Sequence, residues 1–117
     1  MFSVVMEISI EHINSLLYIT VSGRLDTATS ALFDAQMAAE LTHPQPRILV
    51  GLAGVTYVSS AGLRCVLRLI KHTAAHGGRL GLVATPPHIM EVVEISGFPG
   101  LVDIYADRAT ALAAHAA

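Results

Sequence analysis

The sequence predicts an α/β domain in which a mixed sheet of four or five strands is covered by about four helices. The first observation behind this prediction is that strand-like and helix-like patterns of apolar residues follow one another in the order β-β-α-β-α-β-α-β-α. The second is size, since 117 residues, 53% of them hydrophobic, suffice for one domain over residues 1–117 with a single core. In such an order the later strands are expected to be parallel and joined by right-handed connections.

Five segments have strand-like patterns. In residues 6–12 and 17–23 apolar side chains alternate strictly with polar ones, which is typical of half-buried strands. The short segment between these two favours an antiparallel hairpin. Residues 47–52 are apolar without alternation, which indicates a central strand covered on both faces. The remaining strand candidates are residues 79–84 and 101–105.

The first two helices are predicted from caps and from apolar residues at helical spacing. The first follows Asp26 or Thr27 as N-cap, because Phe33, Met37 and Leu41 recur at every fourth position. The second begins at the serine pair and ends before the glycine pair. Its expected apolar stripe is Leu63, Val66, Leu67, Ile70 and Ala74. Met37 and Leu67 are both expected to be buried.

Two further helices are predicted in the second half of the chain. Residues 86–97 begin with prolines and stop at Gly97, as a short helix does. Residues 107–117 form a C-terminal helix capped by Asp107.

Composition excludes several classes of function. A formal net charge of −2 gives no general attraction to nucleic acid, and no apolar run is long enough for membrane insertion. The one cysteine, Cys65, permits no intramolecular disulfide and is expected to be a small core residue. The N-terminal stretch has no secretory signal pattern, so a cytoplasmic protein is expected. The basic residues Arg64, Arg68, Lys71 and Arg79 cluster in one region, as on a solvated helix flank or a binding face.

The stretch "VTYVSSAGLRCVLRLIK" places Ser59 and Ser60 where the second helix starts. Either serine can cap the helix by accepting a bond from a free backbone N–H of the first turn. A hydrolase is not indicated, because His72 lies about 18 Å along the helix from Ser60 at ~1.5 Å per residue. His72 and His76 are spaced for one face of a metal site, but further ligands are not suggested. With nucleotide-binding motifs also missing, neither an enzyme nor a metal or cofactor is expected.

A phosphate on Ser60 would also suit this place. It would add nearly two negative charges at a helix N-terminus, where free N–H groups and the helix dipole favour anions. Ala61 and Gly62 carry little side chain, so a partner could approach closely. Capping and phosphorylation therefore both remain open at this point.

Two segments, "GRLDTATSALFDAQM" and "ILVGLAGVTYVSSAGLRCVL", resemble the STAS domain family, specifically its stand-alone bacterial anti-sigma factor antagonists. The family pattern joins a G-x-L-D turn after the second strand to a phosphorylatable S-S-A-G-L step that opens the second helix. The downstream "GGRLGLVATPPHIMEVVEISGF" is also similar to the family, so the resemblance covers most of the chain.

The resemblance implies a binding protein without catalytic activity. Its partners would be an anti-sigma factor with serine kinase activity, which binds the unphosphorylated form, and a metal-dependent protein phosphatase that resets it. By position the phosphoserine falls on Ser60. The partner surface is expected to contain Ser60 together with Asp26, Ser59, Ala61, Gly62 and Arg64.

Two positions depart from the family pattern. Gly51 stands where the family often has an acidic or amide residue at the end of the third strand, and Ser59 replaces an acidic neighbour of the target serine. Less negative charge is therefore expected around Ser60. A second function stays open, since STAS domains also act as scaffolds or as regulatory subunits of transporters and signalling complexes. Small-molecule or nucleotide sensing at the helix start is a third.

Overall fold

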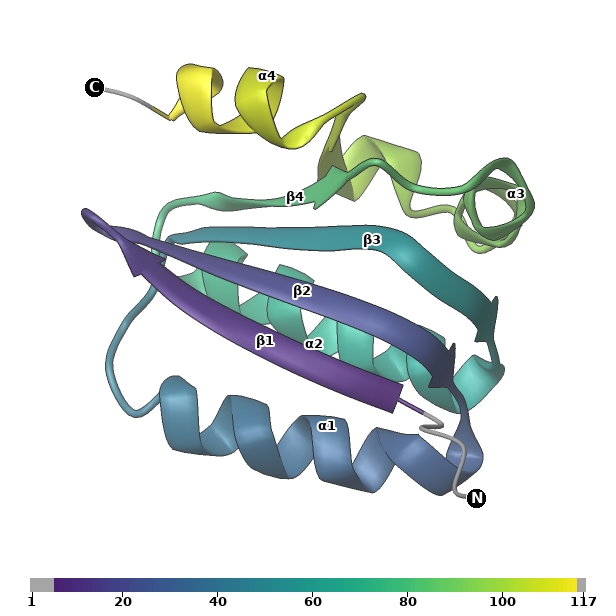
Figure 1. The fold of residues 1–117 in the computed structure, drawn as a ribbon. Coiled ribbons are helices and arrows are strands. Elements are labelled where there is room, and N and C mark those ends of the chain that lie inside the picture. The colour runs from purple at the N-terminus through teal and green to yellow at the C-terminus, as the bar shows by residue number, and fades with distance from the viewer. Residues whose placement is uncertain (1–5, 116–117) are drawn as a thin grey trace.

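A mixed five-stranded sheet runs through the centre of the molecule (Figure 1), in a computed structural model that describes residues 6–115. The strands are β1 (Met6–Ile13), β2 (Leu16–Leu25), β3 (Arg47–Val58), β4 (Arg79–Val83) and β5 (Val102–Tyr105), and they lie side by side in this order. β1 and β2 form an antiparallel hairpin, and all later neighbours are parallel. The predicted mixed sheet is confirmed.

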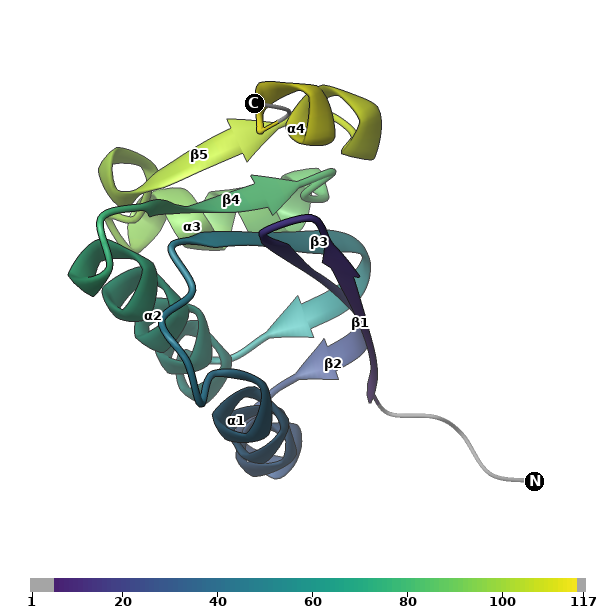
Figure 2. The same cartoon turned by 90° about the vertical axis from the view of Figure 1, so that its left-hand side faces the viewer.

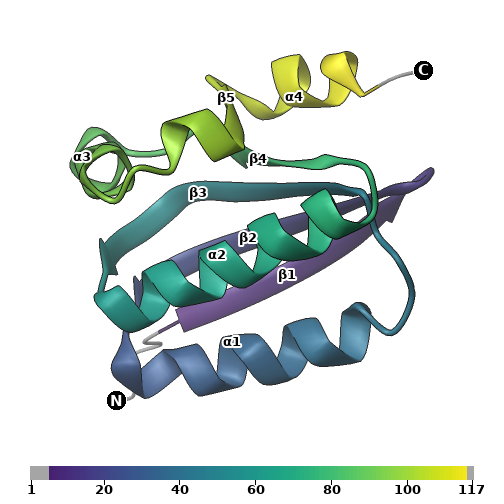
Figure 3. The ribbon, with the colours of Figure 1, turned by 180° about the vertical axis from the view of Figure 1, so that it is seen from behind.

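Helices connect each parallel pair of strands. They are α1 (Thr27–Glu40), α2 (Ser60–Ala75) and α3 (Pro87–Ile95). A short 3₁₀ helix, η1 (Pro99–Leu101), precedes β5, and α4 (Arg108–Ala114) follows it. α1 and α2 lie side by side on one face of the sheet, as expected (Figure 3). α4 lies on the other side of the sheet (Figure 2). The last two residues of the helix expected at 107–117 lie outside the described residues.

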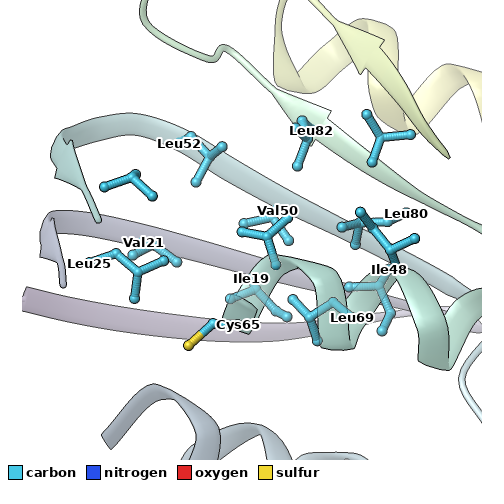
Figure 4. Packing of buried hydrophobic residues seen from close by; sticks show 14 of the residues in the cluster. Ile19, Val21, Leu25, Ile48, Val50, Leu52, Cys65, Leu69, Leu80 and Leu82 are labelled. Atoms are coloured by element: carbon cyan, nitrogen blue, oxygen red, sulfur yellow. The ribbon is translucent and has the colours of Figure 1, made fainter. Parts of the chain in front are cut away.

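Both faces of the sheet are covered. The larger core cluster lies between the sheet and the first three α-helices. Figure 4 shows its centre, where Ile19 of β2 and Val50 of β3 lie beside Leu69 of α2. A smaller cluster forms on the opposite face against α4 and contains Leu16, Tyr18, Leu49, Val83 and Ala111. This second cluster buries Tyr18, although the alternating pattern of its strand predicts a side chain on a half-exposed face.

β3 is twice as long as the apolar run at residues 47–52 predicts, because its second half pairs with the end of β2. Leu25 lies opposite Val58, after register shifts that bend the pair of strands. The expectation that Gly51 ends the strand is therefore wrong. Gly51 lies inside β3 and on the face opposite α2, where an added Cβ would come 3.2 Å from the Tyr18 hydroxyl. The tyrosine side chain thus occupies the space beside this glycine.

The buried stripe of α2 differs from the expected one by about one position. Its buried residues are Gly62, Cys65, Val66, Leu69, Ile70 and Thr73. Leu67 is only partly buried and Ala74 is exposed, so both expectations are wrong, whereas Met37 is buried as expected. The Cys65 flank of α2 faces α1, where Cys65 Sγ lies 3.7 Å from the Ser30 carbonyl oxygen and Arg68 pairs with Asp34 at 2.6 Å.

This difference gives a matched pair of stability predictions. Leu69→Ala should lower the free energy of unfolding by about 2–5 kcal/mol, because Leu69 is 1% exposed and its removal leaves a cavity in the core. Leu67→Ala should lower the free energy of unfolding by clearly less, since the Leu67 side chain is only partly buried. Urea unfolding of the two variants checks the order. A larger loss for Leu67→Ala would contradict the packing of α2 described here.

Candidate functional site

Two helix starts meet at the edge of the sheet where β2 and β3 end. Leu25 and Val58 are paired at this edge, and the Ser59 N–H donates to the Leu25 carbonyl at 3.0 Å. One residue after each strand end, Asp26 caps α1 and Ser59 caps α2. The structure therefore brings together the Asp26 turn and the serine pair, which lie more than thirty positions apart in the sequence.

Asp26 is held by a reciprocal set of hydrogen bonds, a capping box. Its Oδ1 accepts from the N–H groups of Ala28 (3.0 Å) and Thr29 (3.2 Å), and its own N–H donates to Thr29 Oγ1 at 3.0 Å. Its Oδ2 accepts from Arg24 Nε at 3.1 Å. Partial burial by itself would raise the pKa of the Asp26 carboxyl, but the bonds from Arg24, Thr29 and Ala28 together lower it below its ordinary value.

The lowered pKa of Asp26 predicts a specific dependence of stability on pH. A carboxyl whose pKa is depressed by folding contributes stability that is complete above its unfolded value of 3.8 and is lost as the pH falls through the folded value. Asp26→Asn should therefore have a lower free energy of unfolding than the wild type at neutral pH. Below pH 3.8 its free energy of unfolding should decrease less steeply than that of the wild type. Urea midpoints across that range test this. Glu94→Gln, which removes an exposed carboxylate on α3, is the control, and its urea midpoints should change with pH as those of the wild type do.

Sequence reasoning missed Arg24 and Tyr57, which form the rim beside Asp26. The Arg24 guanidinium lies 4.4 Å above the centre of the Tyr57 ring while it pairs with Asp26. Tyr57 keeps 42% of its surface exposed. Arg24 occupies the variable position of the G-x-L-D turn, so its place in that motif is the signal that could have found it. The capping partner Thr29 has a similar signal, since it lies three residues after the cap.

The two serines have different surroundings. Ser59 Oγ accepts from the Gly62 N–H at 3.2 Å and thus caps α2. Ser60 is the first helical residue and is exposed. Its hydroxyl forms no hydrogen bond with any of residues 6–115. Capping therefore falls to Ser59, and the Ser60 hydroxyl is left accessible to solvent.

The other expected partner residues divide into surface and interior positions. Ala61 is half-buried and Arg64 is exposed one helical turn beyond Ser60. Gly62 is buried, because it faces the Leu25 carbonyl so closely that a Cβ would overlap that oxygen. The small size of Gly62 thus serves the packing of α2 against β2, and the expected role in close approach by a partner does not fit a buried position.

Cys65 and His72 of α2 contribute to packing and to hydrogen bonds within the fold. Cys65 is 1% exposed, and burial, with the nearby Asp34 carboxylate, raises the pKa of its thiol to about 11. His72 Nε2 accepts from the Gln45 N–H at 3.1 Å, and burial followed by the charge of His76 lowers the pKa of His72. Within residues 6–115 three or more metal-ligating side chains do not cluster anywhere. In the same range, every helix is too short or too polar to cross a bilayer.

Comparison with known proteins defines the class to which this fold and site correspond. The family model described as "Mlab, STAS domain" matches residues 13–103. The chain therefore belongs to the STAS-domain family, which confirms the resemblance found in the sequence.

Curated relatives point to one branch of this family. Over 109 residues the chain is 33% identical to a Bordetella bronchiseptica protein named "Putative anti-sigma factor antagonist BtrV", covering 93% of this chain and 94% of the relative. It is 27% identical over 108 residues to the anti-sigma F factor antagonist of Paenibacillus polymyxa, covering 92% of each.

Solved structures share the fold. An anti-sigma factor antagonist from Mycobacterium paratuberculosis has a TM-score of 0.82 at 21% identity and covers 93% of this chain and 92% of its own. The phosphorylated form of the Bacillus cell fate determinant SpoIIAA has a TM-score of 0.68 at 19% identity, over 84% of this chain and 90% of its own. Both confirm the mixed sheet with its helices.

Proposed function

We propose that this protein is an anti-sigma factor antagonist whose binding is switched by phosphorylation of Ser60. The observation that carries the proposal is that the two serines differ in their hydrogen bonds. Ser59 caps α2, so that Ser60 is exposed at the first helical position and is not needed for the cap. The names of the two curated relatives support the choice of function.

The proposed partner is an anti-sigma factor with serine kinase activity. It would dock on the surface formed by Asp26, Ser59, Ser60 and Ala61, with the stacked pair Arg24 and Tyr57 at the rim. A metal-dependent protein phosphatase would remove the phosphate and return the protein to its binding form. The antagonist itself then needs no catalytic group.

A phosphate on Ser60 would be stabilised within this chain. The free N–H groups of the first turn and the helix dipole favour an anion there, and acidic residues are missing from the first turn of α2. Arg64, four residues later on the same face, has no carboxylate partner among residues 6–115. A negative group that precedes a positive one by four residues is the favourable orientation for an ion pair on a helix. Phosphorylation would thus change the charge of the docking surface without unfolding α2.

Incubation with the cognate anti-sigma factor kinase and with ATP, followed by mapping of the modified residue, tests the proposal. Phosphate is expected on Ser60, whereas Ser59 should stay unmodified because its hydroxyl is held by the Gly62 N–H. Binding to that kinase should weaken on phosphorylation. Modification of other residues alone, or no change in binding, would refute the switch.

A scaffold function without phosphorylation is the second candidate. It is favoured by Ser59, which stands where an acidic neighbour of the target serine is expected. A scaffold would use the same surface, but Ser60 would remain unmodified in the presence of the kinase and ATP. The mapping experiment therefore separates the two candidates.

A further inference from the structure

Arg47 differs from the other arginines in its surroundings. Within residues 6–115, Arg24, Arg68, Arg79 and Arg108 each pair with a carboxylate at 2.6–3.1 Å. Arg47 and Arg64 pair with none there, and Arg64 is exposed whereas Arg47 is half-buried. A guanidinium that is partly removed from water without a counter-ion is unfavourable. Among the arginines, Arg47 is therefore the one that is partly buried without a carboxylate partner in residues 6–115.

Arg47 lies between two hollows at the edge of the sheet where the parallel strands begin. The turn between β1 and β2, the start of β3, the α2–β4 connection and the end of α4 all reach this edge, on the left of Figure 1. One hollow has a volume of about 380 Å³ and the other about 510 Å³, within the range of small-molecule sites. Arg47 and His115 line both of them.

The two hollows differ in charge. In the larger one Arg79 is already paired, since its Nε donates to Asp103 at 3.1 Å and its Nη2 to the Val102 carbonyl at 3.0 Å. The smaller hollow has no carboxylate in its lining, and Ile13, Leu16 and Leu112 give it apolar walls. Asn14 and Ser15, in the turn between β1 and β2, add polar groups at its rim.

We propose that the smaller hollow binds a small organic anion, a carboxylate with a short apolar chain. The carboxylate would accept hydrogen bonds from Arg47, whose planar guanidinium matches a carboxylate in geometry, with His115 beside it. The apolar chain would lie against Leu16 and Leu112. One fixed positive charge suits a singly charged carboxylate better than a doubly charged phosphate. This site lies at the opposite edge of the sheet from Ser60 and does not depend on the proposed function.

Titration of the isotope-labelled protein, followed by its amide resonances, tests the site with three probes. Hexanoate should shift the amides of Leu16, Arg47, Leu112 and His115 in a saturable way. Hexanamide, which has the same chain without the charge, should not saturate. Inorganic phosphate should bind more weakly than hexanoate. Arg47→Gln should weaken hexanoate binding at least about tenfold, whereas Lys71→Gln, which removes an exposed cation of α2 far from the hollow, should leave it unchanged.

Several results would overturn the proposal. They are a titration in which hexanoate shifts none of these amides, equal binding of hexanoate and hexanamide, or equal binding of hexanoate by the wild type and by Arg47→Gln. Phosphate binding as tight as that of hexanoate would refute the apolar part of the site. The titration of the wild type decides the matter even if Arg47→Gln does not fold.

Discussion

Replacement of Ser60 by aspartate is expected to reduce affinity for the anti-sigma factor kinase about a hundredfold or more while the fold stays intact. Docking would bury the new carboxylate without a counter-ion from the partner, and an uncompensated buried charge costs on the order of 3–5 kcal/mol. The helix start itself favours the anion, so α2 should not melt. Calorimetric titration with the kinase measures the affinity, and circular dichroism checks the fold.

Two neighbouring variants serve as controls for this result. Ser60→Ala should bind the kinase normally and should resist release by ATP, since it cannot accept a phosphate. Ser59→Ala removes the cap of α2 and should lower the free energy of unfolding by about 0.5–2 kcal/mol, with little change in affinity. If Ser60→Asp bound as tightly as the wild type, the switch would be ruled out and the scaffold function would take its place.

The largest loss of stability at the site is expected for Gly62→Ala. A Cβ at Gly62 would overlap the Leu25 carbonyl oxygen and lie 3.0 Å from the carbonyl carbon, and backbone atoms cannot rotate away as a side chain can. The first turn of α2 would have to move from the end of β2, which also weakens the bond from the Ser59 N–H to the same oxygen. A loss of about 3 kcal/mol is expected, as in strong overpacking.

Gly100→Ala is the matched control, because an added Cβ there meets no atom of the described residues within 4 Å. Urea unfolding of both variants gives the comparison. If Gly62→Ala were as stable as Gly100→Ala, the close approach of α2 to Leu25 would be disproved. Where Gly62→Ala remains folded, it should also bind the kinase less well, because Ser60 is displaced with the helix start.

The order of elements could be predicted from the sequence because each has its own local pattern. Alternation in residues 6–12 and the prolines at the start of α3, Pro86 and Pro87, are visible without tertiary information. The length of β3 could not be predicted, since residues 53–58 are a strand only through their pairing with the bent end of β2. The rotation of α2 was missed for a similar reason. Thr73 is polar, and only the packing of α2 shows that it is buried, whereas Cys65 lies in the core as expected.

The sequence places the serine pair at the start of the second helix, as the structure does, but it does not assign a role to each serine. A hydroxyl at either position can cap a helix, and only the backbone conformation of Ser59, which is extended, assigns the cap to it. Arg24 lies in the G-x-L-D motif, but its contacts to Asp26 and Tyr57 join residues from two strands and a helix start, and these are visible only in the fold. Arg47 was not singled out for the same reason, since the hollow beside it is built from elements distant in sequence.

A single residue separates each strand from the helix that follows at the site, Asp26 between β2 and α1 and Ser59 between β3 and α2. The docking surface is therefore carried by paired strands and helix turns, with no intervening loop to be ordered on association. A partner that binds there should meet a preorganised surface, so little conformational entropy is lost by this protein when the complex forms. Under the proposed function, recognition by such a rigid surface would leave the control of binding to charge, and phosphorylation of the single Ser60 hydroxyl would be enough to reverse it.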